Sequence, residues 1–125
     1  MADRNIADLT PEMQEKVNAW VEQMKSANID FIITCTKRTQ SEQDALYSQG
    51  RVSPGPIVTW TRHSKHIEGL AFDFCIMVNG KPDWGMNYRD LWDRAVSIGK
   101  SLGLTQVIGS NGKILEFAHL QLNTA

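Results

Sequence analysis

The sequence predicts a single α+β domain in which helices pack on one side of a small, mainly antiparallel sheet. Its 125 residues fit one domain and leave no room for two ordinary ones. Segments with apolar residues at helical spacing are separated by short, apolar runs typical of strands. The expected order is helix, strand, helix, long loop, strand, helix and a short strand-like end, which is typical of an α+β fold.

The first helix is expected to begin at Thr10 and Pro11. Thr10 can cap the helix, and Pro11 suits the first helical position because its missing N–H would be unpaired there. One apolar stripe then follows at helical spacing: Met13, Val17, Trp20, Val21 and Met24. Residues 31–36 are apolar and β-branched, and they predict the first strand.

A second helix is expected to begin at Ser41, because residues 41–44 have the form of a capping box. It should end at Gly50, since glycine favours helix ends. Residues 51–64 contain Pro54, Gly55 and Pro56 and predict an ordered loop.

The second strand, residues 70–77, alternates in side-chain size. Its large residues face one way and supply the core: Leu70, Phe72, Phe74 and Ile76. Asp73 lies on the other face between the small residues Ala71 and Cys75, so a ligand could approach this carboxylate closely.

A third helix is expected after Asn87, which could cap it, with Gly103 just beyond its end. Its inner face is predicted to hold Leu91, Ala95, Ile98 and Leu102. An apolar segment, residues 114–122, closes the chain and carries Glu116 and His119.

Composition excludes several classes of function. The formal net charge of −1 argues against a nucleic-acid binder that relies on bulk positive charge. Two cysteines are too few for a disulfide framework, so buried free thiols are expected at Cys35 and Cys75. The first fifteen residues contain no apolar stretch, and no apolar run approaches the ~20 residues of a membrane span. We therefore expect a monomer made in the cytoplasm, with no stable membrane association.

Histidines and carboxylates together suggest a metal site. His66 and Asp73 lie seven residues apart, and Glu116 and His119 lie three apart. Two imidazoles and one carboxylate are a common ligand set for catalytic zinc, which leaves a fourth position for water. Glu116 could take the proton of that water, provided that the chain turns before His119, because residues three apart on a straight strand face opposite ways.

Two other side chains are rival ligands. His63 lies three residues before His66. Cys75 lies two residues after Asp73, on the same predicted strand face, although a small buried residue is the simpler interpretation there.

Four ordered motifs resemble a known family, and one of them is the loop of residues 54–59, which reads P-G-P-I-V-T. Residues 64–73 have the form S-x-H-x-x-G-x-A-x-D, residues 38–51 read R-T-Q-S-E-Q-D-A-L-Y-S-Q-G-R, and residues 116–119 read E-F-A-H. Together they resemble zinc peptidases of the D-alanyl-D-alanine carboxypeptidase (VanY-type) and L-alanyl-D-glutamate peptidase family, as found in phage endolysins. The family often has aspartate where this chain has Glu116, and proline where it has Ala118.

The resemblance implies a hedgehog/D-Ala-D-Ala-peptidase-like fold and a role for each matching residue. The implied zinc ligands are His66, Asp73 and His119, with Glu116 as general base. Arg38 would bind a peptide carboxylate or stabilise the oxyanion, the alternative being a solvated salt bridge. Two further residues are candidates for substrate contact. Ser64 could instead bond only to its local turn, and Gln43 could instead bond to the loop.

The implied activity is zinc-dependent hydrolysis of peptidoglycan stem peptides, with the L-alanyl-D-glutamate bond preferred. The chain would be one zinc peptidase domain, residues 1–125, without a separate wall-binding domain. It would act in host lysis, after synthesis in the host cytoplasm and release through a membrane lesion such as a holin pore. A D-alanyl-D-alanine carboxypeptidase and a non-catalytic zinc module that binds a wall or protein partner are the alternatives.

Overall fold

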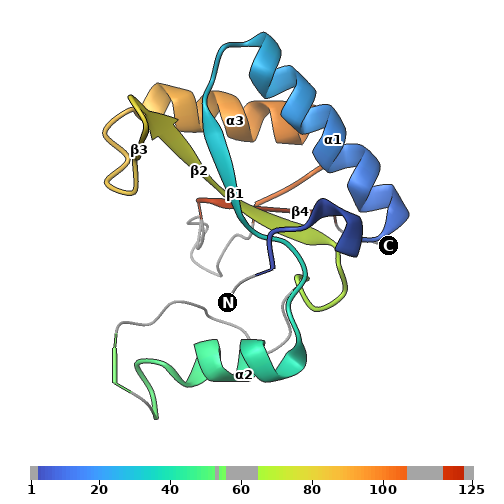
Figure 1. Ribbon diagram of the computed structural model, residues 1–125, viewed down its shortest axis with the longest axis vertical. Helices are drawn as coiled ribbons and strands as arrows, with labels where there is room; N and C mark the ends of the chain where they lie inside the picture. The colour runs from blue at the N-terminus through green and yellow to red at the C-terminus, as the bar shows by residue number, and fades with distance from the viewer. Residues whose placement is uncertain (1–2, 53, 56–64, 107–116, 123–125) are drawn as a thin grey trace.

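The computed structural model describes residues 3–52, 54–55, 65–106 and 117–122. Three helices and four strands, with a short 3-10 helix near the N-terminus, make up the described part (Figure 1). Their bounds are η1 Ile6–Asp8, α1 Pro11–Ser26, β1 Phe31–Cys35, α2 Gln40–Ser48, β2 Ala71–Val78, β3 Lys81–Pro82, α3 Arg89–Ser101 and β4 His119–Gln121. In the part of the chain covered by the model, no helix is both long and apolar enough to cross a membrane.

Strand β2 is the centre of the sheet. β1 pairs with it antiparallel along one edge, and β4 and β3 pair antiparallel with its opposite edge, at the Ala71 and Val78 ends respectively. Every described pairing is antiparallel, which confirms the predicted sheet. As a consequence, residues of β1 and β4, which are far apart in sequence, lie on either side of the same residue of β2, Asp73.

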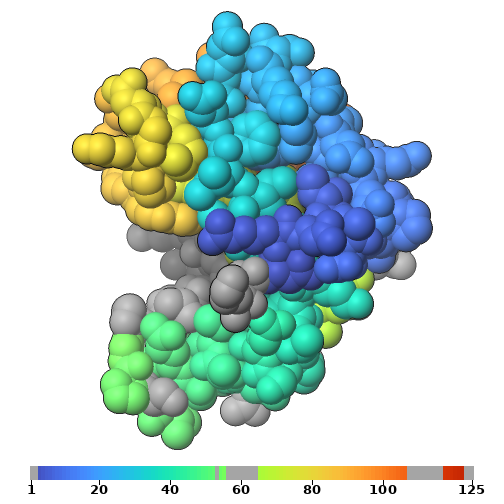
Figure 2. Space-filling view, viewed as in Figure 1, coloured from blue at the N-terminus to red at the C-terminus, as the bar shows by residue number. Residues whose placement is uncertain are grey.

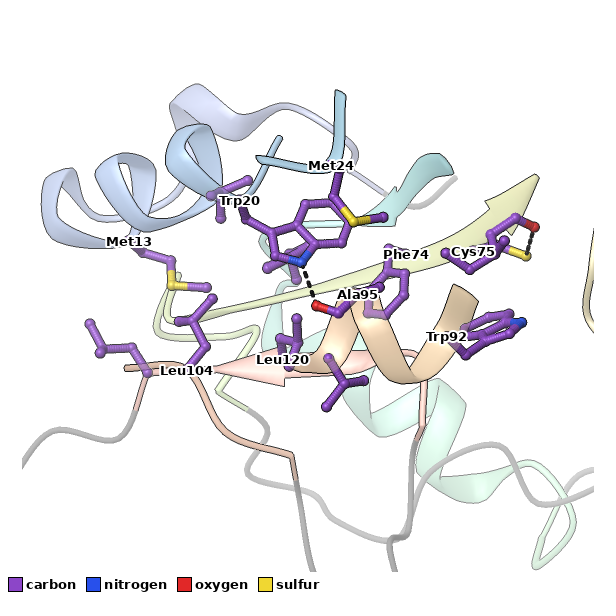
Figure 3. Close-up of a cluster of buried hydrophobic side chains, with 14 of the residues drawn as sticks. Met13, Trp20, Met24, Phe74, Cys75, Trp92, Ala95, Leu104 and Leu120 are labelled. Atoms are coloured by element: carbon purple, nitrogen blue, oxygen red, sulfur yellow. Dashed lines mark hydrogen bonds between the residues drawn. The ribbon is translucent and has the colours of Figure 1, made fainter. Parts of the chain in front are cut away.

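Helices α1 and α3 cover one face of the sheet and form the main core with it (Figures 1 and 3). The indole of Trp20 contacts the Phe72 ring edge-on at 5.0 Å, and its Nε1–H donates to the carbonyl of Ala95 at 2.9 Å. This bond satisfies the polar atom of a fully buried tryptophan. The predicted stripe on α1 is confirmed, with four of its members fully buried: Met13, Val17, Trp20 and Met24.

Helix α2 lies apart from the other two helices (Figure 1). In the space-filling view it forms the lower part of the molecule, below the N-terminal segment and β1 (Figure 2). The N-cap of this helix lies two residues earlier than expected. Thr39 is its N-cap rather than Ser41, because the Thr39 hydroxyl accepts from Glu42 N–H and the Glu42 carboxylate accepts from Thr39 N–H. It ends at Ser48, ahead of Gly50.

The start of α3 also differs from the prediction. Asn87 does not cap the helix, which begins at Arg89 and has no side-chain cap at Tyr88. Asp83 instead fixes the segment that leads into the helix, since its carboxylate accepts from the backbone N–H of Asn87 and Tyr88. The buried residues of α3 are Trp92, Ala95, Val96 and Gly99. Of the predicted inner face, Ala95 is buried, while Leu91, Ile98 and Leu102 are partly buried and pack against the core.

Strand β3 was not expected from the sequence. Asn79 and Gly80 both have positive φ, at 52° and 77°, and they join β2 to β3 in a tight hairpin. An Asn-Gly pair between two strands is the strongest short hairpin signal, so this element could have been predicted.

Candidate metal and substrate site

Asp73 lies where three strands meet. Its partners in register are Cys35 on β1 and His119 on β4, so these three residues are neighbours across the sheet. A bulge in β1 between Ile33 and Cys35 shifts the register by one residue and sets Cys35 opposite Asp73. The side chain of Asp73 is 23% exposed, whereas Ala71 and Cys75 on either side of it are fully buried.

His66 reaches Asp73 from the turn that precedes β2. The backbone N–H of Arg38 donates to the His66 carbonyl at 3.0 Å, which fastens this turn to the segment after β1. The ring donates from Nδ1 to the carbonyl of Thr36 at 2.5 Å, and its Nε2 lies 3.0 Å from Asp73 Oδ1. The imidazole is buried, with both nitrogens in fixed positions.

His119 approaches the same carboxylate oxygen from β4. Its Nδ1 lies 3.0 Å from Asp73 Oδ1, and its Nε2 lies 2.9 Å from Oε1 of Gln121. The His66 and His119 rings are 4.9 Å apart between centroids and nearly perpendicular. Phe117 and Ala118 form a turn just before this strand, in keeping with the bend that the sequence requires between positions 116 and 119.

The carboxylate of Asp73 and the imidazole of His66 strongly affect each other's pKa. Burial alone would lower the pKa of His66, but the hydrogen bond to Asp73, the interaction with Cys35 and the negative charge of Asp73 together outweigh it and raise the pKa to about 10. Burial likewise opposes the charge on Asp73, yet the bonds from His119 and His66 hold the pKa of this carboxyl well below its usual range. The carboxylate thus favours positive charge beside it, either on a ring or on a bound cation.

The chemistry of this donor set fits a metal ion. Each imidazole is fixed through its outer nitrogen by an oxygen atom, of Thr36 or of Gln121, so that its inner nitrogen points at Asp73. Such outer partners orient histidine ligands in metal sites. Cys35, His66 and Asp73 also offer one ligand atom each within 4.8 Å of one another.

Cys35 was missed as a site residue by sequence reasoning. The sequence predicts it as a buried free thiol, and the structure confirms both its burial and its free state. Its place beside Asp73 depends on the β1 bulge, which leaves no signal in the residue spacing. Cys75 is also a buried free thiol, and burial raises its pKa.

Arg38 extends the site toward α2. Its Nη1 donates to Oε1 of Gln43 at 2.5 Å, its Nη2 lies 3.4 Å from Sγ of Cys35, and Nη2 lies 3.6 Å from Asp73 Oδ2. The side chain is only 13% exposed, so the solvated salt bridge considered as an alternative is wrong. Gln43, which accepts the hydrogen bond from Arg38, is fully buried.

Three residues singled out from the sequence lie outside the described residues. They are the substrate candidate Ser64, the general-base candidate Glu116 and the rival ligand His63. The structure therefore brings together His66, Asp73 and His119, with Arg38 and Gln43 beside them.

Comparison with solved structures defines the class of fold. The chain is similar to the L-Ala D-Glu endopeptidase ChiX of Serratia marcescens, with a TM-score of 0.69 and 18% identity over 98% of this chain and 89% of that one. It is also similar to the D,D-pentapeptidase VanY from a VanB-type resistance cassette, solved in complex with Zn(II), with a TM-score of 0.65 and 12% identity over 91% of this chain and 72% of that one. The fold is that of VanY-type peptidases.

Sequence comparison gives the family. Residues 2–114 match the phage L-alanyl-D-glutamate peptidase family, and the chain belongs to this family. It is 34% identical to the peptidoglycan L-alanyl-D-glutamate endopeptidase CwlK of Bacillus subtilis, over 93% of this chain and 74% of CwlK. It is 33% identical to the L-alanyl-D-glutamate peptidase of Listeria phage A118, over 94% of this chain but only 38% of that enzyme. The family predicted from the motifs is confirmed.

Proposed function

We propose that this protein is a zinc-dependent peptidase that cleaves the L-alanyl-D-glutamate bond of peptidoglycan stem peptides and acts as a phage-type endolysin. The observation that carries the proposal is the approach of two imidazoles to one oxygen of Asp73, with the Arg38 guanidinium on the other oxygen. Membership of the phage L-alanyl-D-glutamate peptidase family supports the choice of bond.

His66 Nε2, Asp73 and His119 Nδ1 would hold the zinc ion. These three atoms supply the two-nitrogen, one-oxygen ligand set of many catalytic zinc sites. When bound, zinc supplies Lewis acidity, which polarises a peptide carbonyl and makes water a nucleophile near neutral pH. Thr36 and Gln121 would keep the two rings in the orientation that this requires.

Glu116 would act as general base and then as general acid. It would accept a proton from the attacking water and pass it to the amine of the leaving D-glutamate. Its role is inferred from the E-F-A-H motif, in which it lies three residues before His119. The turn at Phe117 and Ala118 supports this role, since it removes the need for the two residues to face opposite ways.

Arg38 would stabilise the negative charge that develops on the carbonyl oxygen. Its guanidinium is held by Gln43 and lies beside Cys35, so little reorganisation is needed when the charge appears. Gln43 would therefore act on the substrate indirectly, by positioning Arg38, while Ser64 would contact the peptide directly.

Mass spectrometry of muropeptides after digestion of purified sacculi tests the function. New amino-terminal D-glutamate, absent when a chelator is present and restored by zinc, is the expected result. Loss of terminal D-alanine alone would instead assign a D-alanyl-D-alanine carboxypeptidase. Zinc binding without any cleavage would assign a non-catalytic zinc module.

Glu116→Gln tests the chemistry separately from metal binding. The variant should retain zinc and lose most turnover, because an amide cannot accept the proton of the attacking water. Turnover near that of the unaltered protein would show that Glu116 is not the base.

A further inference from the structure

The segment between β3 and α3 carries two exposed aromatic side chains. Trp84 is 57% exposed and Tyr88 is 49% exposed. Within the described residues, the one other large apolar side chain exposed to this degree is Val52, which lies after α2. Neither aromatic residue takes part in the proposed chemistry, and exposed apolar surface of this kind can serve as a ligand-binding site.

The segment that carries these rings is firmly held. The carboxylate of Asp83 accepts from the backbone N–H of Asn87 and Tyr88, each at 3.0 Å, and from Nε1 of Trp92 at 3.1 Å. The Trp84 ring lies 6.4 Å from the ring of Trp92, which is buried. The backbone that carries both residues and the ring of Trp84 are therefore held in place, which lowers the entropy lost when a ligand binds.

Ring contacts through the buried Trp92 link this segment to the element that carries the proposed catalytic residues. The guanidinium of Arg89 lies 4.2 Å over the ring of Phe117, and that ring packs 6.1 Å from Trp92. Phe117 directly follows Glu116 and lies two residues before His119. We define the aromatic patch as Trp84, Tyr88, Arg89 and Phe117.

We propose that the aromatic patch binds the glycan strand of peptidoglycan, an inference that rests on the proposed function. In peptidoglycan the L-alanine of the stem is joined to the lactyl group of N-acetylmuramic acid, so the bond between L-alanine and D-glutamate lies one residue from a sugar. An enzyme that cuts this bond must accommodate that sugar next to its catalytic residues. A bond at the D-alanine end of the stem lies several residues farther from the glycan.

The chemistry of the patch suits an amino sugar. Exposed aromatic faces stack on the apolar C–H faces of pyranose rings, as Trp84 and Tyr88 could. Arg89 offers N–H donors for the carbonyl oxygen of an N-acetyl group. Aromatic faces for stacking and N–H donors for hydrogen bonds together match a sugar chain that is rich in hydroxyl and N-acetyl groups.

Paired substrates provide the first test. Trp84→Ala and Tyr88→Ala are each assayed on the free tripeptide L-alanyl-D-glutamyl-diaminopimelate and on the same peptide attached to N-acetylglucosaminyl-N-acetylmuramic acid. We expect kcat/KM to fall about tenfold on the glycan-bearing substrate and to stay within about twofold on the free peptide. Trp84→Phe should retain most activity, and Val52→Ala is the matched control for loss of an exposed apolar side chain. Equal losses on both substrates, or no loss on either, would overturn the proposal.

Calorimetric titration with peptide-free glycan oligomers tests the patch without any cleavage. Saturable binding to the unaltered chain that is lost in Trp84→Ala would support the glycan site even if no stem peptide were cut. Cleavage at L-alanyl-D-glutamate with no glycan binding would overturn the glycan site and leave the proposed function intact. Circular dichroism of each variant confirms that it is folded.

Discussion

At the residue scale, a single atom organises the site. Oδ1 of Asp73 lies 3.0 Å from a nitrogen of each histidine, and the outer nitrogens of both rings are fixed by oxygen acceptors. The pair of His66 and Asp73 was expected from the sequence because residues 64–73 resemble a zinc peptidase motif, whereas their spacing alone is a weak signal. The two outer partners, Thr36 and Gln121, could not be predicted, since each is defined by the fold around a ring.

Gln121 is expected to tune metal affinity through His119. Gln121→Ala removes the oxygen that orients the ring, so zinc affinity should fall by about 10- to 100-fold. Competition with a chromophoric chelator measures the change. Gln121→Glu keeps an acceptor at the same place and should bind zinc nearly as tightly as the unaltered protein. Unchanged affinity in Gln121→Ala would show that the ring is held by other contacts.

Arg38 is expected to act through its geometry as well as its charge. Lysine cannot contact Gln43, Cys35 and Asp73 simultaneously as a guanidinium does. Arg38→Lys should therefore lower kcat/KM by about a hundredfold while zinc content stays the same. Lys37→Ala removes an exposed neighbouring cation and is the control. A lysine variant with full activity would assign Arg38 a purely electrostatic role.

At the element scale, local signals predicted some boundaries and misplaced others. The Thr10-Pro11 start of α1 was predicted because cap and proline act on their own helix. The cap of α2 was placed at Ser41 because two overlapping patterns compete, and Thr39 prevails through its reciprocal bonds with Glu42. Asp83 lies too far before α3 for a sequence pattern to reveal its role.

Asp83 is expected to make the free energy of unfolding depend on pH in the acid range. Burial would raise the pKa of its carboxyl, but the N–H donors of Tyr88, Asn87 and Trp92 lower it overall. Because the pKa of Asp83 is lower in the folded state than its unfolded value of 3.8, the charged carboxylate stabilises the fold at pH values above 3.8. This stabilisation is lost as the pH falls from 3.8 through the lower pKa of the folded state. Urea unfolding between pH 7 and pH 3 should show a weaker acid dependence in Asp83→Asn.

Asp90→Asn provides the comparison for this measurement. It removes an exposed carboxylate from the first turn of the same helix. If Asp83→Asn and Asp90→Asn changed the acid dependence equally, the hydrogen bonds of Asp83 would not be its cause.

The turn before β2 is expected to couple stability to the metal site. Gly69 has a φ of +72°, and a Cβ there would lie 3.2 Å from the backbone nitrogen of Thr10. Gly69→Ala should lower the free energy of unfolding by about 1–2 kcal/mol and weaken zinc binding, because the turn also positions His66. Denaturant unfolding and zinc competition measure the two effects.

Gly80→Ala is the matched control for this turn. Its φ is +77° and a Cβ would meet nothing within 4 Å, so it shares the backbone strain without the clash. This variant should lose stability yet bind zinc normally. Equal zinc affinities for Gly69→Ala and Gly80→Ala would show that the turn before β2 does not contribute to metal binding.

At the scale of the whole molecule, the antiparallel sheet creates the site. Asp73 in the middle strand has His119 beside it on one edge and Cys35 on the other. Composition and periodicity predicted an α+β fold with this kind of sheet. They could not predict which residues would be opposite each other, because register and the β1 bulge depend on packing across the whole domain.

X-ray absorption spectroscopy at the zinc edge tests the central claim most directly. With zinc bound by His66, Asp73 and His119, the spectrum should show nitrogen and oxygen neighbours at about 2.0–2.1 Å and the outer-shell scattering of two imidazoles. A sulfur neighbour at about 2.3 Å, abolished in Cys35→Ser, would instead place the metal on the Cys35 side of Asp73 and contradict the proposed ligand set.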